Sequence, residues 1–244
     1  MEDKKQFNRV EKKYLITNKD KDLLLNVIRQ YMREDSYYRS GIFNIYFDND
    51  NFDLIIQSID HPIFKEKLRA RSYEGYDKVF IEIKTKIVGK EENVGYKRRV
   101  LISRRDYDEL IKHKTSMLDL ARRDIESRTD KQIAKEIDYF IEHFDLKPKI
   151  LVYYNRESYV DDNNLRITFD SDLKYRTRNL KFNKKSSDKS YFKNENNIIM
   201  EIKAQDALPL WLVHTLSSEH IYPQRFSKIG MIYEKIRKEK TKHV

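Results

Sequence analysis

Polar and apolar residues alternate along much of the chain with a period of two, which is typical of β-strands. The alternation predicts strands over residues 9–16, 42–49, 65–73, 78–88, 93–103, 149–160, 164–173 and 197–204. Residues i, i+2 and i+4 of a strand share one face, so most of these segments are expected to have one apolar and one polar face.

Helical spacing separates some of these strands. Apolar residues near a period of 3.6 predict a first helix that begins within residues 18–22, and further helices over 106–113, 129–144, 207–220 and 228–237. The lysine-rich stretch 176–197 is predicted to be a mobile loop or a loose hairpin. No internal repeat and no convincing linker interrupts the chain, so we expect one α+β domain over residues 1–244.

The polar faces of the predicted strands are rich in arginine and lysine. Their charged residues, strand by strand, are Arg9, Glu11 and Lys13; Lys67, Arg69 and Arg71; Glu82, Lys84 and Lys86; Arg156; Arg166 and Asp170; and Glu201 and Lys203. For any one strand by itself, the alternative interpretation is a sheet face that simply meets solvent. However, like charges two residues apart on one face repel, and such clusters are tolerable where a polyanion fills the space beside them.

Closure of the sheet would explain why the pattern recurs. An antiparallel barrel of about eight strands would place the cations in one shared lumen. The fold prediction is therefore an α+β protein with an antiparallel β-barrel tunnel, a polar basic lumen, and helices packed against the apolar outer faces.

Composition narrows the range of partners. The 244 residues have a formal net charge of +10, which indicates a polyanionic partner such as nucleic acid, anionic lipid or a phosphate compound. Cysteine is absent, which excludes a disulfide framework and a thiolate metal site and agrees with a cytoplasmic location. The sequence has no signal-peptide pattern and no run of about 18 apolar residues, so no membrane span is expected.

Glutamates accompany the cations on three of the predicted faces. Mg²⁺ and Mn²⁺ prefer oxygen ligands, typically one or two carboxylates together with phosphate oxygens. Glu201, Glu11 and Glu82 are therefore the candidate ligands of a Mn²⁺ or Mg²⁺ ion. For each of them the alternative is a salt bridge to a neighbouring lysine or arginine. The six histidines show no shared spacing that suggests a metal site.

Nine short segments occur in an order and spacing that are specific in combination. They read RVEKKY, YFDNDNFDL, KLRARSY, FIEIKTK, YKRR, YNRESY, LRITFDSDL, IIMEIK and RFSK. Through them, from Phe7 to about Tyr233, the chain resembles the VTC domain, the polyphosphate-polymerase branch of the triphosphate tunnel metalloenzyme (CYTH-like) superfamily.

Two positions depart from the wider superfamily pattern. The opening signature of the superfamily is Glu-x-Glu-x-Lys, and this chain has Arg9, Glu11 and Lys13 at those positions, which is similar to the polymerase branch. A family arginine after the YFDNDNFDL segment corresponds here to Ser58, with Lys67 as a substitute charge.

The resemblance implies a role for each matching residue. The phosphate contacts that it implies are Lys13, Arg69, Arg71, Lys84, Lys97, Tyr154, Arg156, Arg166, Ser227 and Lys228. Among these, the residues expected to hold the transferring phosphates are Arg69, Arg71, Arg166 and Lys228. Glu201 is the implied metal ligand, while Arg9 and Lys203 are candidate substrate contacts from the strand pattern.

The implied reaction transfers the γ-phosphate of ATP to a growing chain of inorganic polyphosphate. A terminal phosphate is already an oxyanion, so catalysis needs positioning and charge stabilisation more than a strong base. Two alternatives stay open: hydrolysis of tripolyphosphate or a nucleoside triphosphate by the same fold, and binding of polyphosphate without catalysis. Arg9 weighs against hydrolysis because it replaces a carboxylate of the hydrolytic signature.

The expected partners are ATP and inorganic polyphosphate. The aromatic residues are not arranged as in an RNA-recognition sheet, so nucleic acid is not expected. A membrane partner, where one exists, would be a separately encoded protein.

Overall fold

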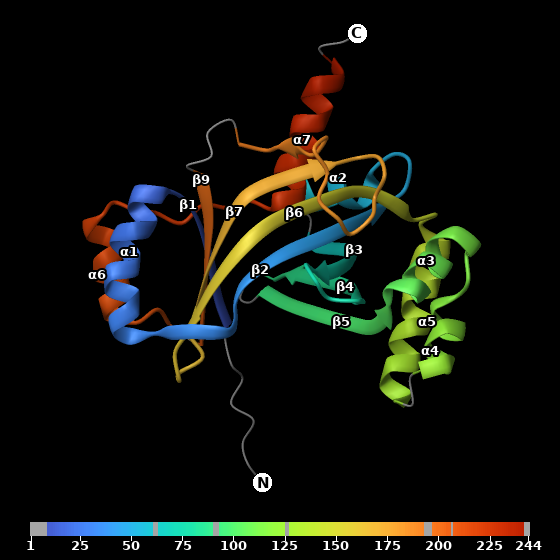
Figure 1. The fold of residues 1–244 in the computed structure, drawn as a ribbon, viewed down its shortest axis with the longest axis horizontal. Helices are drawn as coiled ribbons and strands as arrows, with labels where there is room; N and C mark the ends of the chain where they lie inside the picture. Colours follow the sequence, from blue (N-terminus) through green and yellow to red (C-terminus); the bar gives the residue numbers. More distant parts are fainter. Residues whose placement is uncertain are drawn as a thin grey trace. The chain divides into compact units, whose positions relative to one another are not determined.

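The computed structural model describes residues 9–60, 63–89, 93–124, 127–192, 197–205 and 207–241, and shows an α+β chain (Figure 1). The strands are β1 (Arg9–Thr17), β2 (Arg33–Asp48), β3 (Phe64–Tyr73), β4 (Lys78–Val88), β5 (Asn93–Ser103), β6 (Lys147–Val160), β7 (Arg166–Arg176), β8 (Lys189–Ser190) and β9 (Asn197–Gln205). The helices are α1 (Asn18–Tyr31), α2 (Asp53–Ile59), α3 (Arg104–His113), α4 (Met117–Asp124), α5 (Arg128–His143), α6 (Leu210–Ser218) and α7 (Lys228–Thr241).

Each predicted strand is present, and the differences lie where the alternating pattern is weak. Strand β2 begins at Arg33 rather than at the predicted residue 42. The prediction missed its first half because this part is polar and largely exposed on both faces. The short helices α2 and α4 were not predicted. Helix α6 is shorter than the predicted 207–220, since Pro209 occupies its N-cap position and the helix ends at Ser218.

Hydrogen bonding orders the strands β1-β9-β7-β6-β2-β3-β4-β5, with β8 paired to β7. The pairs β1–β9, β7–β9, β2–β3, β3–β4 and β4–β5 are antiparallel, as predicted. The order has β1 and β5 at its two ends, and no pairing joins them in the part of the chain that the structure describes. Closure of the sheet into a tunnel therefore stays a prediction.

Two compact units divide the chain, and each is assembled from three segments. Unit 1 comprises Met1–Gly41, Tyr154–Leu173 and Ser190–Phe226, and unit 2 comprises Ile42–Tyr153, Lys174–Lys189 and Ser227–Val244. Strands β2, β6, β7 and β8 contribute residues to both units. The division therefore does not follow the order of the sequence, and a single domain over residues 1–244 stays a prediction.

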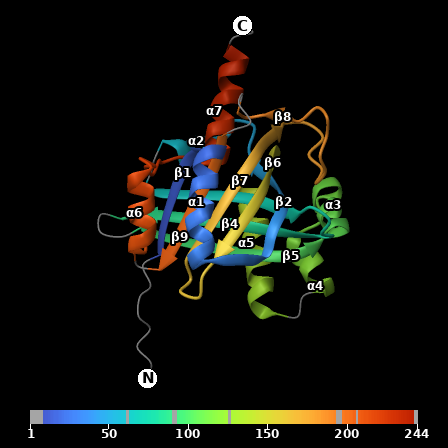
Figure 2. The same ribbon diagram turned by 60° about the vertical axis from the view of Figure 1, so that its left-hand side comes forward.

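In unit 1, helices α1 and α6 lie side by side and supply the apolar partners of one sheet face (Figures 1 and 2). Thr17 begins α1 with a capping box, in which its hydroxyl accepts from the backbone N–H of Asp20 and the Asp20 carboxylate accepts in return. The buried core joins Leu24 and Ile28 of α1 to apolar residues of β1, β7 and β9. Alternate residues of these strands are thereby left on the opposite face.

In unit 2, helices α3, α4 and α5 form one group (Figure 1) that shares a core with β3, β4 and β5. These three strands run side by side (Figure 2). Ile81 and Ile83 of β4 are almost completely buried, as are Ala134 and Ile137 of α5. Burial of an aliphatic side chain of this size contributes about 1.5–3 kcal/mol, so the core fixes which face of these strands turns inward.

The loop after β7 in unit 2, predicted to be a mobile loop or a loose hairpin, is organised around Arg176. The Arg176 guanidinium, 6% exposed, donates to the backbone carbonyls of Asn179 and Asn183 at 2.9 Å and pairs with Asp188 at 2.7 Å. Phe182 of the same loop packs in the core against Tyr107, with ring centroids 5.0 Å apart. These contacts favour an ordered loop.

None of the helices in the described part of the chain is long and apolar enough to cross a membrane.

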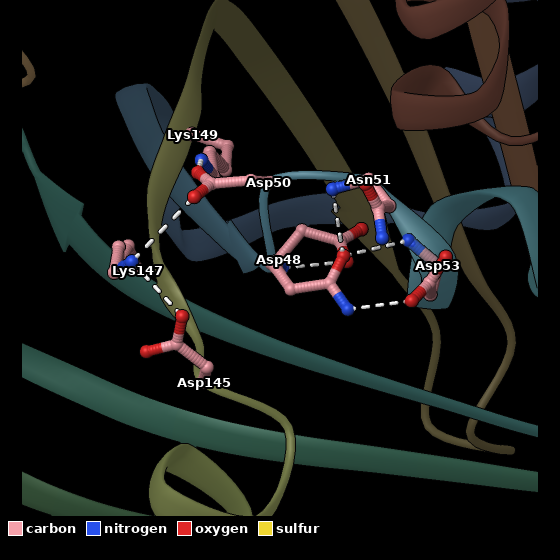
Figure 3. A network of polar contacts seen from close by, with 8 residues as sticks. Asp48, Asp50, Asn51, Asp53, Asp145, Lys147 and Lys149 are labelled. Carbon is pink, nitrogen blue, oxygen red and sulfur yellow. Dashed lines mark hydrogen bonds and ion pairs between the residues drawn. The ribbon is translucent and has the colours of Figure 1, made fainter.

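A buried aspartate fixes the turn between β2 and α2 (Figure 3). Asp48 is fully buried, and its carboxylate accepts from the backbone N–H groups of Asn49 at 2.9 Å, Leu54 at 3.1 Å and Ile55 at 2.9 Å. Two of these donors belong to the first turn of α2, where N–H groups have no partner within the helix. Asp50, two residues further, is exposed and pairs with Lys149 and with Lys147.

Replacement of Asp48 by alanine should destabilise the protein by about 3 kcal/mol, because three backbone donors lose their acceptor in a buried place. Urea unfolding of the purified variant measures this loss. Asp50→Ala is the matched control, since it removes an exposed carboxylate from the same turn and should change stability little. Equal losses in the two variants would contradict the assigned role of Asp48.

Candidate functional site

The face of unit 2 that turns away from its core is strongly basic. Its charged residues include Lys67, Arg69 and Arg71 of β3, Glu82 and Lys84 of β4, and Lys97 and Arg99 of β5, and these seven are together called the basic face. The strand register sets them in two rows across the three strands, Arg69–Glu82–Arg99 and Lys67–Lys84–Lys97. The sequence predicted each of these residues except Arg99 as a site residue, and the structure brings them together.

Glu82 is the one acidic residue among those that define the basic face, and it lies at the centre of the first row. It is 1% exposed, and one carboxylate oxygen accepts from Arg69 Nε at 2.6 Å. The other oxygen lies 3.3 Å from Lys97 Nζ and 3.9 Å from Arg99. Arg71 is held from the side, since its Nε donates to Asn44 Oδ1 at 2.9 Å.

The pKa values of this group show how strongly the cations act on one another and on Glu82. Burial by itself would raise the pKa of Glu82, but Arg69, Arg71 and Lys97 lower it to about 2. Burial lowers the pKa of Lys97, and Arg99 adds to that effect while Glu82 opposes it. In the second row, lysines lie directly opposite one another across β3, β4 and β5, an arrangement in which like charges repel.

In unit 1, the face of β1, β7 and β9 that turns away from the core is also charged, but its cations have carboxylate partners within the unit. On β1 and β9, Glu11 lies opposite Lys203, and Lys13 lies opposite Glu201. Along the strands, Glu11 pairs with Lys13 at 3.1 Å and Glu201 pairs with Lys203. The four residues form a square of alternating charge. Arg9 begins β1, and its side chain lies outside the described residues.

Two arginines complete this face of unit 1. Arg156 Nε and Nη2 donate to the two oxygens of the buried Asp170 at 2.6 and 2.8 Å. Burial lowers the pKa of Arg156, but Asp170 outweighs burial and keeps it well above the usual value. Arg166 Nη2 lies 2.8 Å from Asp35, and its Nε donates to Ser158 Oγ at 3.0 Å. We call these residues, with the square on β1 and β9, the paired face.

The two faces therefore differ in charge balance. On the paired face, Glu11, Glu201, Asp170 and Asp35 each lie beside a cation, whereas Glu82 is the one carboxylate among the seven residues that define the basic face. Sequence reasoning placed Asp170 on the same face as Arg166 without naming it as a site residue, and it did not find Asp35. Asp35 lies in the polar first half of β2, which gave no strand signal, while Arg99 could have been found because it follows Lys97 by two residues.

The three predicted metal ligands lie in different surroundings. Glu201, 8% exposed, and Glu11 contribute oxygens to the paired face, and a hard divalent ion with phosphate ligands needs only one or two carboxylates. Both oxygens of Glu82 face cations, which favours its alternative role as a salt bridge. The described residues contain no group of three or more His, Cys, Asp or Glu side chains that could hold a metal ion by itself.

The predicted residues near the C-terminus lie in unit 2. Helix α7 begins at Lys228, as the sequence predicted, and Ser227 Oγ accepts from the backbone N–H of Gly230 at 3.0 Å. A Cβ on Gly230 would lie 2.8 Å from that hydroxyl and 3.3 Å from Ile59 of α2, so glycine permits the close approach of the two helices.

The predicted phosphate contact Tyr154 is in unit 1, 3% exposed, with the Arg156 guanidinium 5.4 Å from its ring centroid.

Solved structures show a similar fold. A protein from Hippeastrum, described as a proposed adenylyl cyclase with a dominant triphosphatase activity, matches with a TM-score of 0.57 at 16% identity. The match covers 93% of this chain and 96% of that one. A proposed adenylate cyclase from Vibrio parahaemolyticus (13% identity, 93% and 98% covered) and the PH1819 protein from Pyrococcus horikoshii (13%, 93% and 99%) give TM-scores of 0.48 and 0.46. The match at a TM-score of 0.57 shows that the chain shares the fold of the Hippeastrum protein.

A family model gives the more particular assignment. The model of the VTC domain matches residues 8–236, nearly the whole chain. The chain belongs to the VTC domain family, and the resemblance inferred from its sequence segments is confirmed.

Acidification should test the ion pairs of Glu82. Its pKa is lower in the folded protein (about 2) than its ordinary value of 4.5, so the stabilisation is present above pH 4.5 and is lost as pH falls toward 2. Between pH 6 and pH 3 the loss should amount to about 2 kcal/mol, because the folded-state pKa lies below this range. Chemical unfolding of wild type and Glu82→Gln between pH 6 and pH 3 measures it, and the stability difference between them should shrink as the pH falls. A difference that does not change with pH would contradict the assignment.

Proposed function

We propose that this protein makes inorganic polyphosphate by transferring the γ-phosphate of ATP to the end of a growing chain, with Mn²⁺ or Mg²⁺ as cofactor. The observation that carries the proposal is the concentration of arginine and lysine on the basic face, on the side of the sheet that the core does not use. Membership of the VTC domain family supports it.

The basic face is suited to an extended chain of phosphates. Arg69 and Arg71 have planar guanidinium groups that bind phosphate oxygens in pairs, and Lys84 and Lys97 supply point charges. The two rows of the face are separated by two residues along each strand, or about 7 Å, so a chain that follows the strands meets cations repeatedly. Lys67, beside Lys84, compensates for the family arginine that Ser58 replaces.

Glu82 has a positioning role in this proposal. Its carboxylate holds the Arg69 side chain by a 2.6 Å hydrogen bond and reduces repulsion among the cations around it. Because its pKa is about 2, it stays ionised near neutral pH and cannot deliver a proton to the reacting phosphate. The reaction on this face therefore depends on charge and orientation, as phosphoryl transfer generally does.

The paired face is proposed to contribute the metal and further phosphate contacts. Glu201, with Glu11 as a helper, would hold the divalent ion, which neutralises phosphate charge when bound. Lys13 and Lys203 are now paired with these two carboxylates and would turn to phosphate oxygens. The remaining contacts proposed from the family match are Tyr154, Arg156, Arg166, Ser227 and Lys228, and the strand pattern adds Arg9.

Closure of the sheet and a cytoplasmic location, both predicted from the sequence, are part of the proposal. The predicted closure of the sheet into a tunnel would enclose the polymer as it grows. The reaction is placed in the cytoplasm, where ATP is available and a chain without cysteine needs no oxidising environment. The attacking group is the terminal phosphate of the polymer, which distinguishes the reaction from hydrolysis of a triphosphate by water.

Incubation with ATP and Mn²⁺ should yield ADP and a ladder of acid-labile polyphosphate. Arg69→Ala should reduce the rate on the order of 10²–10³-fold, because it removes a charge-stabilising contact. Arg105→Ala is the control: Arg105 is an exposed arginine of α3, outside the basic face, and its loss should leave the rate unchanged. Orthophosphate appearing in step with ADP, without polymer at any time, would show a hydrolase and reject the polymerase proposal.

The metal assignment leads to a separate prediction. Glu201→Gln keeps the size of the side chain but removes the charge that binds a divalent ion, so the variant should lose turnover at Mn²⁺ concentrations that saturate the wild type. Glu74→Gln removes an exposed carboxylate of unit 2 and should keep turnover. Melting temperature confirms that both variants fold. Full activity of Glu201→Gln would exclude Glu201 as the metal ligand.

A further inference from the structure

One end of the basic face is aromatic rather than charged. Two residues beyond Arg71 on β3 stands Tyr73, and two residues before Glu82 on β4 stands Phe80, so both lie on the same side of the sheet as the cations. Phe80 is opposite Arg71, and both aromatic residues are partly exposed. These rings add an apolar, planar surface to a charged face on the side away from the core of unit 2.

These aromatic side chains are held in a defined arrangement. The Arg99 guanidinium lies 4.6 Å from the centroid of the Phe80 ring, and Arg99 is about half exposed. The Tyr73 ring meets Phe80 at 90° with a centroid distance of 6.3 Å, and Tyr76 meets Tyr73 at 6.4 Å. Edge contacts from Tyr73 fix the Phe80 ring, and the half-exposed Arg99 guanidinium lies over one face of that ring, so a planar ligand group can stack on the guanidinium or on the ring. We call Tyr73, Phe80 and Arg99 the stacking platform.

Bases of nucleotides bind to surfaces of this kind. They stack on aromatic rings and on guanidinium planes, and the interaction does not need hydrogen bonds to the base edge. Inorganic polyphosphate has no flat apolar group and would gain nothing from Phe80. The platform therefore indicates a ligand that combines a base with phosphates.

The distance from the platform to the cations fits such a ligand. Glu82 lies two residues from Phe80 and Lys84 four residues from it, which corresponds to about 7 Å and 13 Å along the strand. An extended nucleoside triphosphate has a comparable length from its base to its γ-phosphate. A base on Phe80 thus leaves the phosphates beside Arg71, Arg69 and then Lys84.

We propose that the stacking platform binds the nucleobase of the donor nucleoside triphosphate and thereby sets which end of the basic face the donor occupies. This inference rests on the proposed function for its choice of ATP as donor. Because stacking is tolerant of base identity, the platform favours nucleotides over inorganic tripolyphosphate without strong selection among purines.

Calorimetric titration of wild type and Phe80→Leu with ATP and with inorganic tripolyphosphate, both with Mg²⁺, tests the proposal. The substitution removes the ring without changing charge, so ATP should bind about 10-fold more weakly while tripolyphosphate binds as before. Tyr96→Leu is the matched control. Tyr96 is an exposed aromatic residue of β5 that pairs with Thr85 on the opposite side of the sheet, and its loss should change neither affinity.

Each other outcome counts against the platform. Unchanged ATP affinity in Phe80→Leu, or an equal loss for ATP and tripolyphosphate, would overturn base binding at Phe80. A wild type that binds ATP no more tightly than tripolyphosphate would do the same. These are binding measurements, so they are separate from the product assay: a protein that hydrolyses ATP would fail the polymerase proposal and still show the ring-dependent preference for ATP.

Discussion

The ion pairs of Glu82 are the interaction on which the basic face depends. Three neighbouring strands bring Arg69, Lys97 and Arg99 to one buried carboxylate, and the pKa of about 2 shows that the cations outweigh the effect of burial. Removing one partner from a buried group of charges generally costs several kcal/mol, because the remaining charge is left without compensation. Glu82 thus permits a concentration of cations that the sheet would otherwise not tolerate.

On the paired face, cations are also compensated by carboxylates, but in separate pairs. There Arg156 and Asp170 form a two-bond pair, and Arg166 is held by Asp35 and Ser158. Such pairs give each guanidinium a fixed orientation, but they also mean that an incoming anion competes with a carboxylate. A surface of this kind suits a ligand that arrives with a cation, whereas the basic face suits the phosphates themselves. The metal ligands are accordingly expected where carboxylates are abundant.

Much of the fold could be predicted from the sequence because the alternation is unusually regular. Leu68 and Ala70 are buried while Lys67 and Arg69 face the other way, and β4 repeats the pattern with Ile81 and Ile83. The signal fails where burial does not alternate. The first half of β2 is polar on both faces, so it concealed Asp35, and α2 depends on Asp48, which acts through backbone groups that have no sequence pattern. Which cations have a carboxylate partner is set by neighbours distant in sequence, so the difference between the two faces could not be predicted either.

Function sets a limit on how far the charges of the basic face can be balanced. A second carboxylate in the Lys67–Lys84–Lys97 row would relieve repulsion between lysines that lie opposite one another, but it would also repel the phosphates that the row is proposed to bind. With Glu82 confined to the neighbouring row and almost completely buried, its charge acts on Arg69 and Lys97 and is shielded from a ligand on the surface. The stability that the face lacks must come from the apolar side of the same strands, where Ile81 and Ile83 belong to one core with Ile137 of α5. The alternation of β4 therefore joins the two requirements in one strand: its apolar residues supply the stability that its polar residues need in order to hold charge.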